Sequence, residues 1–398
     1  MPLQVKSHLP SGLPVPDPDS RAHSDLVAAY IRARIAESGG SIGFAEFMQH
    51  ALYAPGLGYY SAGSRKFGVG GDFVTAPEIS PLFGRVLGAQ CAELLGELPQ
   101  ASVLELGAGS GALAVDLLAK LASLNALPRQ YMILEPSAEL QARQKERLAG
   151  EVPEILKRVE WLSSLPRDFV GVVIANEVAD ALPVSRFVIR KGNVAELRVV
   201  ARGNGFGWLE QEAEAPLRTA VGCIEQDMGA RLPDGFVSEV CLAMPGWIGD
   251  LAVSVGRGFV FLFDYGMSRR EYYSAGHDGG WLRCHFRHRV HDDPLILPGI
   301  QDLTAWVDFS MIADAATRNG MEVTGYLTQA HFLLGGGLQR ELEQLSALPV
   351  REQFETSRQV KLLTLPGEMG EHFKCIGLRK GAVTVPSVFE LSDRAHTL

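Results

Sequence analysis

Apolar and polar positions along the chain follow two different spacings. Up to about residue 100, apolar residues recur every three or four positions, which predicts helices over 25–36, 44–54 and 81–95. Beyond that point, short apolar runs alternate with helical stripes. The runs predict strands over 102–106, 130–134, 171–175, 258–263, 322–326 and 373–379. This alternation predicts an α/β fold in which a parallel sheet carries helices on both faces.

A proline-rich start and a break in the alternation suggest domain boundaries. We expect a flexible arm over 1–20, an N-terminal helical and lid region over 21–98, and a C-terminal tail over 385–398. The sheet domain then occupies 99–185 and 257–384. Between these two parts, residues 186–256 carry short β segments and two helices, which predicts an inserted β-rich subdomain.

The most informative stretch is 103–111, where an apolar strand leads into a glycine-rich turn and then into an amphipathic helix. Gly107, Gly109 and Gly111 permit backbone angles and a close ligand approach that a Cβ would obstruct. The first turn of the following helix presents free amide donors. We therefore expect a nucleotide-like ligand at this turn, rather than a turn that serves the fold alone.

Two classes of cofactor fit this turn. Residues 107–112 match G-x-G-x-x-A, the loose fingerprint of NAD-dependent oxidoreductases. Glu105, however, stands two residues before the first glycine, and glycines occupy alternate positions up to Gly111. That pattern resembles motif I of class I methyltransferases that depend on S-adenosylmethionine (SAM), where an acidic residue faces the cationic, amino-acid end of the cofactor. The spacing favours SAM as cofactor, bound at Gly107, Gly109 and Gly111.

Polar side chains also follow the next strands, and ligands of such sheets bind at the carboxyl ends of the strands. Glu135 follows the second strand, where a carboxylate accepts hydrogen bonds from both ribose hydroxyls. Asn176, Glu177 and Asp180 follow the third strand and place an amide and two carboxylates within one turn. Helix capping is the alternative for each of these groups, and for Asp302 further along the chain.

Composition and charge narrow the range of partners. The chain of 398 residues has a net charge of -9, which disfavours duplex nucleic acid as a partner. No apolar run is long enough to span a bilayer and the start lacks a signal pattern, so we expect a cytoplasmic protein. The five cysteines form no C-x-x-C pair, and arginines interleave with His285, His288 and His291. We therefore expect reduced cysteines, a basic loop and no metal site.

Six ordered stretches carry a resemblance to a known family. They are GDFVTAPEISPLFG (71–84), ELGAGSGAL (105–113), ILEPSAELQARQKERL (133–148), ANEVADALPV (175–184), FDYG (263–266) and DLTAWVDFS (302–310). Together they resemble the MidA family of class I SAM-dependent methyltransferases, which includes mitochondrial complex I assembly factors with protein-arginine methyltransferase activity. The resemblance covers roughly residues 25–380. The family pattern N-E-F-F-D-A-L-P differs here, because Val178 and Ala179 replace its two aromatic residues.

The resemblance implies a Rossmann-like methyltransferase sheet and a protein substrate, such as a respiratory-complex or other assembly subunit, methylated on arginine. A guanidinium is planar, cationic and weakly nucleophilic, so carboxylates must orient it and help to take up its proton. We expect Glu177 and Asp180 to be these catalytic carboxylates. The predicted cofactor contacts are Glu105 and Asn176 at the amino-acid end of SAM, Glu135 at the ribose, and Thr75 and Ser80 in a lid that closes over it.

Three other functions stay open at this stage. The altered Val178 and Ala179 and the large insertion fit a SAM-binding assembly factor without turnover. A methyltransferase for a small molecule would need a closed apolar pocket instead of an open acidic groove. The G-x-G-x-x-A match alone supports an oxidoreductase, which would bind NADH rather than S-adenosylhomocysteine.

Overall fold

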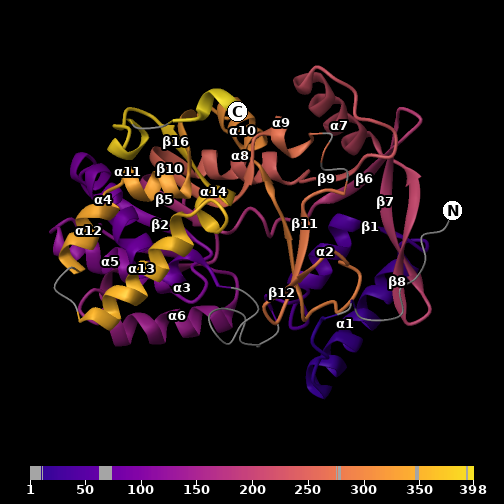
Figure 1. Ribbon diagram of the computed structural model, residues 1–398, viewed down its shortest axis with the longest axis horizontal. Helices are drawn as coiled ribbons and strands as arrows, with labels where there is room; N and C mark the ends of the chain where they lie inside the picture. The colour runs from indigo at the N-terminus through magenta and orange to yellow at the C-terminus, as the bar shows by residue number, and fades with distance from the viewer. Residues whose placement is uncertain are drawn as a thin grey trace. The chain divides into compact units, whose positions relative to one another are not determined.

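The computed structural model describes residues 10, 12–61, 74–274, 276, 279–345, 349–390 and 393–398 (Figure 1). The chain divides into two compact units, and each is assembled from segments that are distant in the sequence. Unit 1 takes the described residues of Met1–Phe73, Asp180–Met244 and Arg269–Trp306. Unit 2 takes those of Val74–Ala179, Pro245–Ser268 and Val307–Leu398.

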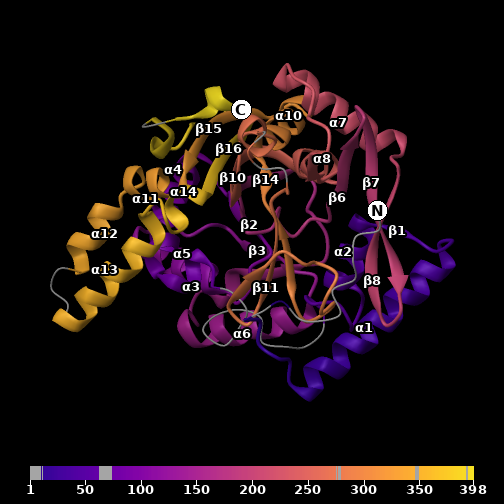
Figure 2. The same ribbon diagram turned by 45° about the vertical axis from the view of Figure 1, so that its right-hand side comes forward.

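Unit 2 is organised around a sheet that has eight strands in the described part of the chain, with the main order β15-β16-β10-β5-β2-β3-β4 (Figure 2). Neighbours from β4 to β10 pair in parallel, and β14 pairs in parallel with β10. β16 runs antiparallel to both β10 and β15. The strands are β2 (Ser102–Leu106), β3 (Tyr131–Leu134), β4 (Val159–Leu162), β5 (Phe169–Asn176), β10 (Val255–Met267), β14 (Val307–Asp308), β15 (Glu322–Thr328) and β16 (Phe373–Lys380).

Helices pack against this sheet through a continuous apolar core. Phe263 of β10 meets the rings of Phe83 and Phe332 edge to face, with ring centroids 5.1 and 4.8 Å apart. The helices of this unit are α3 (Ala76–Ile79), α4 (Pro81–Glu97), α5 (Ala112–Ser123), α6 (Ala138–Glu151), α8 (Met244–Ser254), α10 (Phe309–Arg318), α11 (Gln329–Gly335), α12 (Leu338–Leu345), α13 (Val350–Thr364) and α14 (Met369–His372), with short 3-10 turns at Leu156–Arg158, Ser387–Glu390 and Ala395–Thr397. Burial of apolar side chains from both helices and strands stabilises the sheet.

Unit 1 has its own apolar core, formed where helices pack on antiparallel strands. Phe44 and Phe47 of α2 pack on Trp208 and Phe206 of β8. One sheet has the order β1-β7-β6-β9 with β8 beside β7, and a second has the order β12-β11-β13. The elements are α1 (Pro18–Glu37), β1 (Ile42–Gly43), α2 (Phe44–Tyr53), β6 (Ser185–Arg190), β7 (Asn193–Arg202), β8 (Gly205–Glu212), α7 (Ala215–Met228), β9 (Val237–Val240), α9 (Arg269–Tyr272), β11 (Leu282–Phe286), β12 (Arg289–His291) and β13 (Asp302–Ala305).

The predicted α/β class and all six predicted strands are confirmed, with three corrections. The sheet is mixed, because its last two strands in the sequence, β15 and β16, pair antiparallel. Asp302 begins strand β13 instead of capping a helix, and Asp308 caps the helix that follows. α1 begins at Pro18, inside the predicted arm, because the Asp17 side chain accepts a hydrogen bond from the Ser20 amide. The predicted domain boundaries themselves stay predictions.

Across the described ranges, none of the helices combines the length and the apolar composition that a membrane crossing requires.

Candidate functional site

The turn after β2 has the backbone that its glycines predict. Gly107, Gly109 and Gly111 have φ values of 64°, 53° and 82°, in the left-handed region that a Cβ disfavours. Gly111 is the residue that precedes the first turn of α5. The turn therefore presents main-chain groups and the N-terminus of α5 without side chains in the way.

The end of β5 combines strain with an unsatisfied polar atom. Glu177 has a φ of 54°, which is unusual for a residue with a long side chain. Its amide donates to the Phe263 carbonyl over 2.9 Å, and the Asn176 amide group donates to its carboxylate over 3.1 Å. Within the described part of the chain, Asn176 Oδ1 is buried and has no hydrogen-bond partner. A buried acceptor of this kind favours a ligand that brings a donor.

The structure brings this strand end and the glycine turn together. A Cβ built on Gly107 would lie 3.2 Å from Cγ2 of Val178, so Val178 lies directly beside the first glycine. Asp264, within the neighbouring β10, supports this segment: its carboxylate accepts from the amides of Ala179 and Tyr265, over 2.9 Å each. Asp264 was not among the predicted site residues, although its place directly after a buried strand in FDYG is a usable signal.

Two predicted cofactor carboxylates are buried beside the turn. Burial raises the pKa of Glu105 to about 7, Tyr131 opposes this by donating a hydrogen bond over 2.7 Å, and the charge of Glu135 adds to it. Glu135 is 4% exposed and accepts from the Ser137 amide over 3.0 Å and from Gln144 over 3.2 Å. Ser137 itself caps α6, so Glu135 supports the start of that helix without being its cap.

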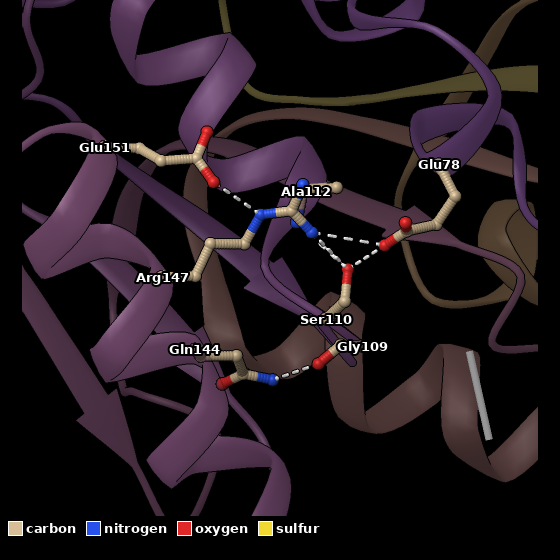
Figure 3. Close-up of polar contacts among 7 residues, drawn as sticks. All are labelled: Glu78, Gly109, Ser110, Ala112, Gln144, Arg147 and Glu151. Atoms are coloured by element: carbon tan, nitrogen blue, oxygen red, sulfur yellow. Dashed lines mark hydrogen bonds and ion pairs between the residues drawn. The ribbon is translucent and has the colours of Figure 1, made fainter. Parts of the chain in front are cut away.

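Helix α6 holds the turn from the side, a role that the sequence did not predict. Gln144 Nε2 donates to the carbonyl of Gly109 over 2.9 Å (Figure 3). One turn further along the helix, Arg147 donates to the Ser110 hydroxyl over 2.9 Å, and Ser110 donates to the carboxylate of Glu78 in α3. In the sequence these residues look like the polar face of a surface helix, which carries no signal for such contacts.

The two predicted lid residues lie at the ends of the short helix α3. Thr75 precedes α3 and makes no capping hydrogen bond with its side chain, whereas Ser80 is buried and caps α4 by accepting from the Leu82 amide over 3.3 Å. The rest of the predicted lid, over 62–73, lies outside the described residues.

Asp180 belongs to unit 1, whereas Glu177 belongs to unit 2. The side chain of Asp180 is 7% exposed, and its carbonyl accepts from the Ala305 amide over 3.0 Å. Burial raises the pKa of Tyr60 well above its usual range, and the carboxylates of Asp302 and Asp180 add to this. Tyr60 in turn donates to Asp302 over 2.9 Å, so unit 1 gathers acidic and phenolic groups around Asp180.

The histidines that recur every three residues lie in a β-hairpin. His285 belongs to β11 and His291 to β12, and the turn between these strands contains His288. Over the ranges that the structure describes, no group of three or more histidine, cysteine, aspartate or glutamate side chains could hold a metal ion.

Comparisons with known proteins agree with this geometry. A family model described as "Putative S-adenosyl-L-methionine-dependent methyltransferase" matches residues 86–327. The protein arginine methyltransferase NDUFAF7, mitochondrial, of Danio rerio is 30% identical over 84% of this chain and 82% of its own length. The Drosophila melanogaster homolog is 29% identical over 92% of this chain and 88% of its own length.

A solved structure matches nearly the whole chain. A Burkholderia thailandensis protein, crystallised with S-adenosyl-homocysteine, is 39% identical and superimposes with a TM-score of 0.92 over 97% of this chain and 100% of its own. A native crystal structure from the same organism is 38% identical, with a TM-score of 0.89 over the same shares of the two chains.

The residues at the turn fit SAM. The glycine turn adopts the left-handed backbone that lets main-chain groups approach a ligand closely, and the orphaned Asn176 Oδ1 suits the ammonium group of its amino-acid end. The cofactor is therefore SAM, and the oxidoreductase alternative is set aside. The family match, the relatives and the site geometry agree that this chain belongs to the family of SAM-dependent methyltransferases.

Proposed function

We propose that this methyltransferase transfers the methyl group of SAM to an arginine side chain of a partner protein. The observation that carries this proposal is Glu177, a carboxylate on a strained backbone, held by Asn176 next to the glycine turn. Strain of this kind costs about 1–3 kcal/mol and is typical of functional positions. The names of the relatives, which are protein arginine methyltransferases, support the choice of acceptor.

SAM supplies a methyl group that is already activated, so the chain needs to bind the donor, align the acceptor and exclude water. In our proposal the turn of Gly107, Gly109 and Gly111 accommodates the donor. Glu135 accepts from its ribose hydroxyls, and Asn176 accepts from its ammonium group. Glu105 adds negative charge on the same side once it is ionised. Thr75 and Ser80 close the site from the start of α3 and α4.

On the acceptor side, we assign the guanidinium to Glu177 and Asp180. Only two residues separate them in the chain, so their Cα atoms lie within about 11 Å of each other. One planar guanidinium can donate charge-assisted hydrogen bonds to two carboxylates, which is the interaction that this assignment requires. Removal of a proton makes the guanidinium nitrogen nucleophilic, and a carboxylate that accepts this proton serves as the general base.

The loss of two aromatic residues beside this pair does not leave the segment unsupported. The amide of Ala179 is anchored by the buried carboxylate of Asp264, and Val178 packs against Gly107. The first contact is made by the main chain, so it does not depend on the side chain at position 179. The second is made by the small side chain of Val178 itself. We therefore expect the altered segment to support turnover, with a changed choice of substrate.

The test is methyl transfer from labelled SAM to arginine-containing peptides and to proteins from a lysate. We expect the double variant Glu177→Gln, Asp180→Asn to lose about 100-fold or more in kcat, the range of general-base catalysis. Its affinity for S-adenosylhomocysteine, measured by calorimetry, should change little. Glu139→Gln serves as the control, because Glu139 lies on α6 and pairs with Arg143. Full activity of the double variant would overturn the assignment.

The same experiment separates the alternatives. Binding of S-adenosylhomocysteine without methylation of any lysate protein would favour an assembly factor without turnover, and methylation of small molecules alone would favour the small-molecule enzyme.

Our proposal also includes a respiratory-complex or other assembly subunit as acceptor and a cytoplasmic location. The five cysteines are all free thiols, as is usual in a reducing compartment.

A further inference from the structure

We propose that Arg147 is a positioning residue for SAM: through Ser110 and Glu78 it holds the glycine turn in the shape that binds the cofactor. This inference depends on the cofactor alone, so it stands whichever acceptor is methylated. Arg147 acts on the turn through Ser110, a residue between two of the turn's glycines.

The contacts form one closed network (Figure 3). Nη1 of Arg147 lies 2.9 Å from the Ser110 hydroxyl and 3.3 Å from Oε1 of Glu78. The Ser110 hydroxyl donates to the same oxygen of Glu78 and accepts from the Ala112 amide over 3.3 Å. One guanidinium therefore ties together α3, the turn and the first residue of α5.

A second side chain of α6 works on the same turn. Gln144 precedes Arg147 by three residues, so both project from one face of the helix. Gln144 donates to the carbonyl of Gly109 and accepts from the indole of Trp161 over 2.9 Å. The main chain at Gly109 and the side chain at Ser110 are thus held by adjacent turns of α6, which restricts the left-handed backbone at Gly109 and Gly111.

The charges explain why arginine is needed at this place. Its side chain is one-third exposed and that of Glu78 is 17% exposed, so solvent screens this pair less than a surface pair. Nε donates to Glu151 over 3.0 Å, which fixes the plane of the guanidinium. Burial raises the pKa of Asp116 in α5 to about 6, while Arg85 and Arg147 lower it. Without Arg147, the carboxylates of Glu78, Glu151 and Asp116 would repel one another. Arg85, which also lowers the pKa of Asp116, would be the cation that remains near them.

The experiment compares two arginines of the same helix. For Arg147→Met we expect the Kd of S-adenosylhomocysteine and the KM for SAM to rise about tenfold, the size of one lost charged hydrogen bond, with kcat at saturating SAM within about twofold. Arg147→Lys should recover part of the affinity, because an ammonium group cannot bond Ser110 and Glu151 in one plane. Arg143→Met is the control, since Arg143 pairs with Glu139 and, within the described part of the chain, forms no hydrogen bond with the turn.

If Arg147→Met lowers stability, a double-mutant cycle with Ser110→Ala still distinguishes a specific effect on cofactor binding from a general loss of stability. We expect Ser110→Ala to weaken S-adenosylhomocysteine binding and to remove most of the further effect of Arg147→Met, because both changes break the same contact. Thermal unfolding of the free variants measures any general loss of stability. The proposal is overturned if Arg147→Met leaves the Kd unchanged, if Arg143→Met weakens binding equally, or if the two effects simply add.

Discussion

At the scale of single residues, burial gives Glu105 an acid–base behaviour unlike that of a surface carboxylate. It is 2% exposed, and its pKa is raised from the usual 4.5 to about 7. The folded chain therefore keeps this proton between pH 4.5 and 7, whereas the unfolded chain releases it. The stability that Glu105 contributes is fully present below pH 4.5 and is lost as the pH rises through 7.

The first prediction concerns the direction in which stability changes with pH. Relative to Glu105→Gln, the free energy of unfolding of the natural chain should fall by up to about 3 kcal/mol as the pH rises from 4.5 to above 7, about 1.4 kcal/mol per unit of pKa shift. Urea unfolding at a series of pH values measures it. Glu139→Gln, whose side chain is partly exposed on α6, should run parallel to the natural chain. Parallel curves for Glu105→Gln as well would refute the prediction.

The second prediction concerns the turn itself. A Cβ at Gly111 would meet Gln144 at an ordinary 3.5 Å, so space is available, but the φ of 82° is strained for alanine. We expect Gly111→Ala to cost about 1–2 kcal/mol of stability and to weaken S-adenosylhomocysteine binding. Gly150→Ala makes the matched comparison, since Gly150 lies in α6 with nothing within 4 Å of its added Cβ. That change should stabilise the helix by about 0.5–1 kcal/mol and leave binding intact.

At the scale of elements, regular apolar patterns were predictable and local exceptions were not. The predicted strands β2, β5, β10 and β16 bury most of their side chains, so their apolar runs stand out. β4 has the sequence VEWL and its side chains are only half-buried, so no apolar run marked it as a strand. The turn between β11 and β12 contains Arg287 and His288 with positive φ, where glycine or asparagine would have given a signal.

The positions of the candidate site residues also divide into those that a regular pattern predicts and those that depend on packing. The positions of Glu135, Asn176 and Glu177 at strand ends were predictable because polar residues at the ends of buried strands gather at one edge of a parallel sheet, and their roles toward the cofactor and the acceptor stay predictions. Gln144 and Arg147 were not, because their role depends on which face of α6 meets the turn, and that is decided by packing. Asp180 was predictable as a polar residue, but its membership of unit 1 depends on how distant segments assemble.

A third prediction tests the coupling of α6 to the turn. The Ser137 hydroxyl accepts from the Leu140 amide over 3.4 Å, and Ser137→Ala should cost about 1 kcal/mol of stability. Because α6 carries Gln144 and Arg147, we also expect weaker S-adenosylhomocysteine binding in calorimetry. Asp308→Ala removes the comparable cap of α10, where the carboxylate accepts from the Met311 amide over 3.1 Å. It should lower stability without changing the affinity, and an equal loss in both variants would count against the coupling.

At the scale of the whole molecule, the chain is acidic, with a net charge of -9. Such a charge attracts cationic partners over distances of the order of the Debye length, about 8 Å at physiological salt. An arginine side chain within a basic segment is therefore a favourable acceptor. In the proposed mechanism the overall charge adds to the local effect of Glu177 and Asp180, and salt screens the long-range part first.

The fourth prediction uses this dependence on salt. A peptide whose arginine is flanked by basic residues should show a kcat/KM about tenfold higher than one with acidic flanks at low ionic strength. The preference should shrink as salt is raised to about 0.5 M, because the Debye length then falls below 5 Å. Methyl transfer at several salt concentrations measures it. A preference for acidic flanks, or one that salt does not change, would contradict the expectation.

The order of strands in unit 2 determines when its sheet can be completed during translation. β16 is the last strand to be made, yet it lies between β15 and β10 in the sheet, so the ribosome must translate through Lys380 before the gap can be filled. The glycine turn at 107–111 is made long before β16 completes the sheet. The edge of β10 that β16 will occupy therefore stays unpaired while residues 268–380 are being made, and an unpaired strand edge is a target for chaperones.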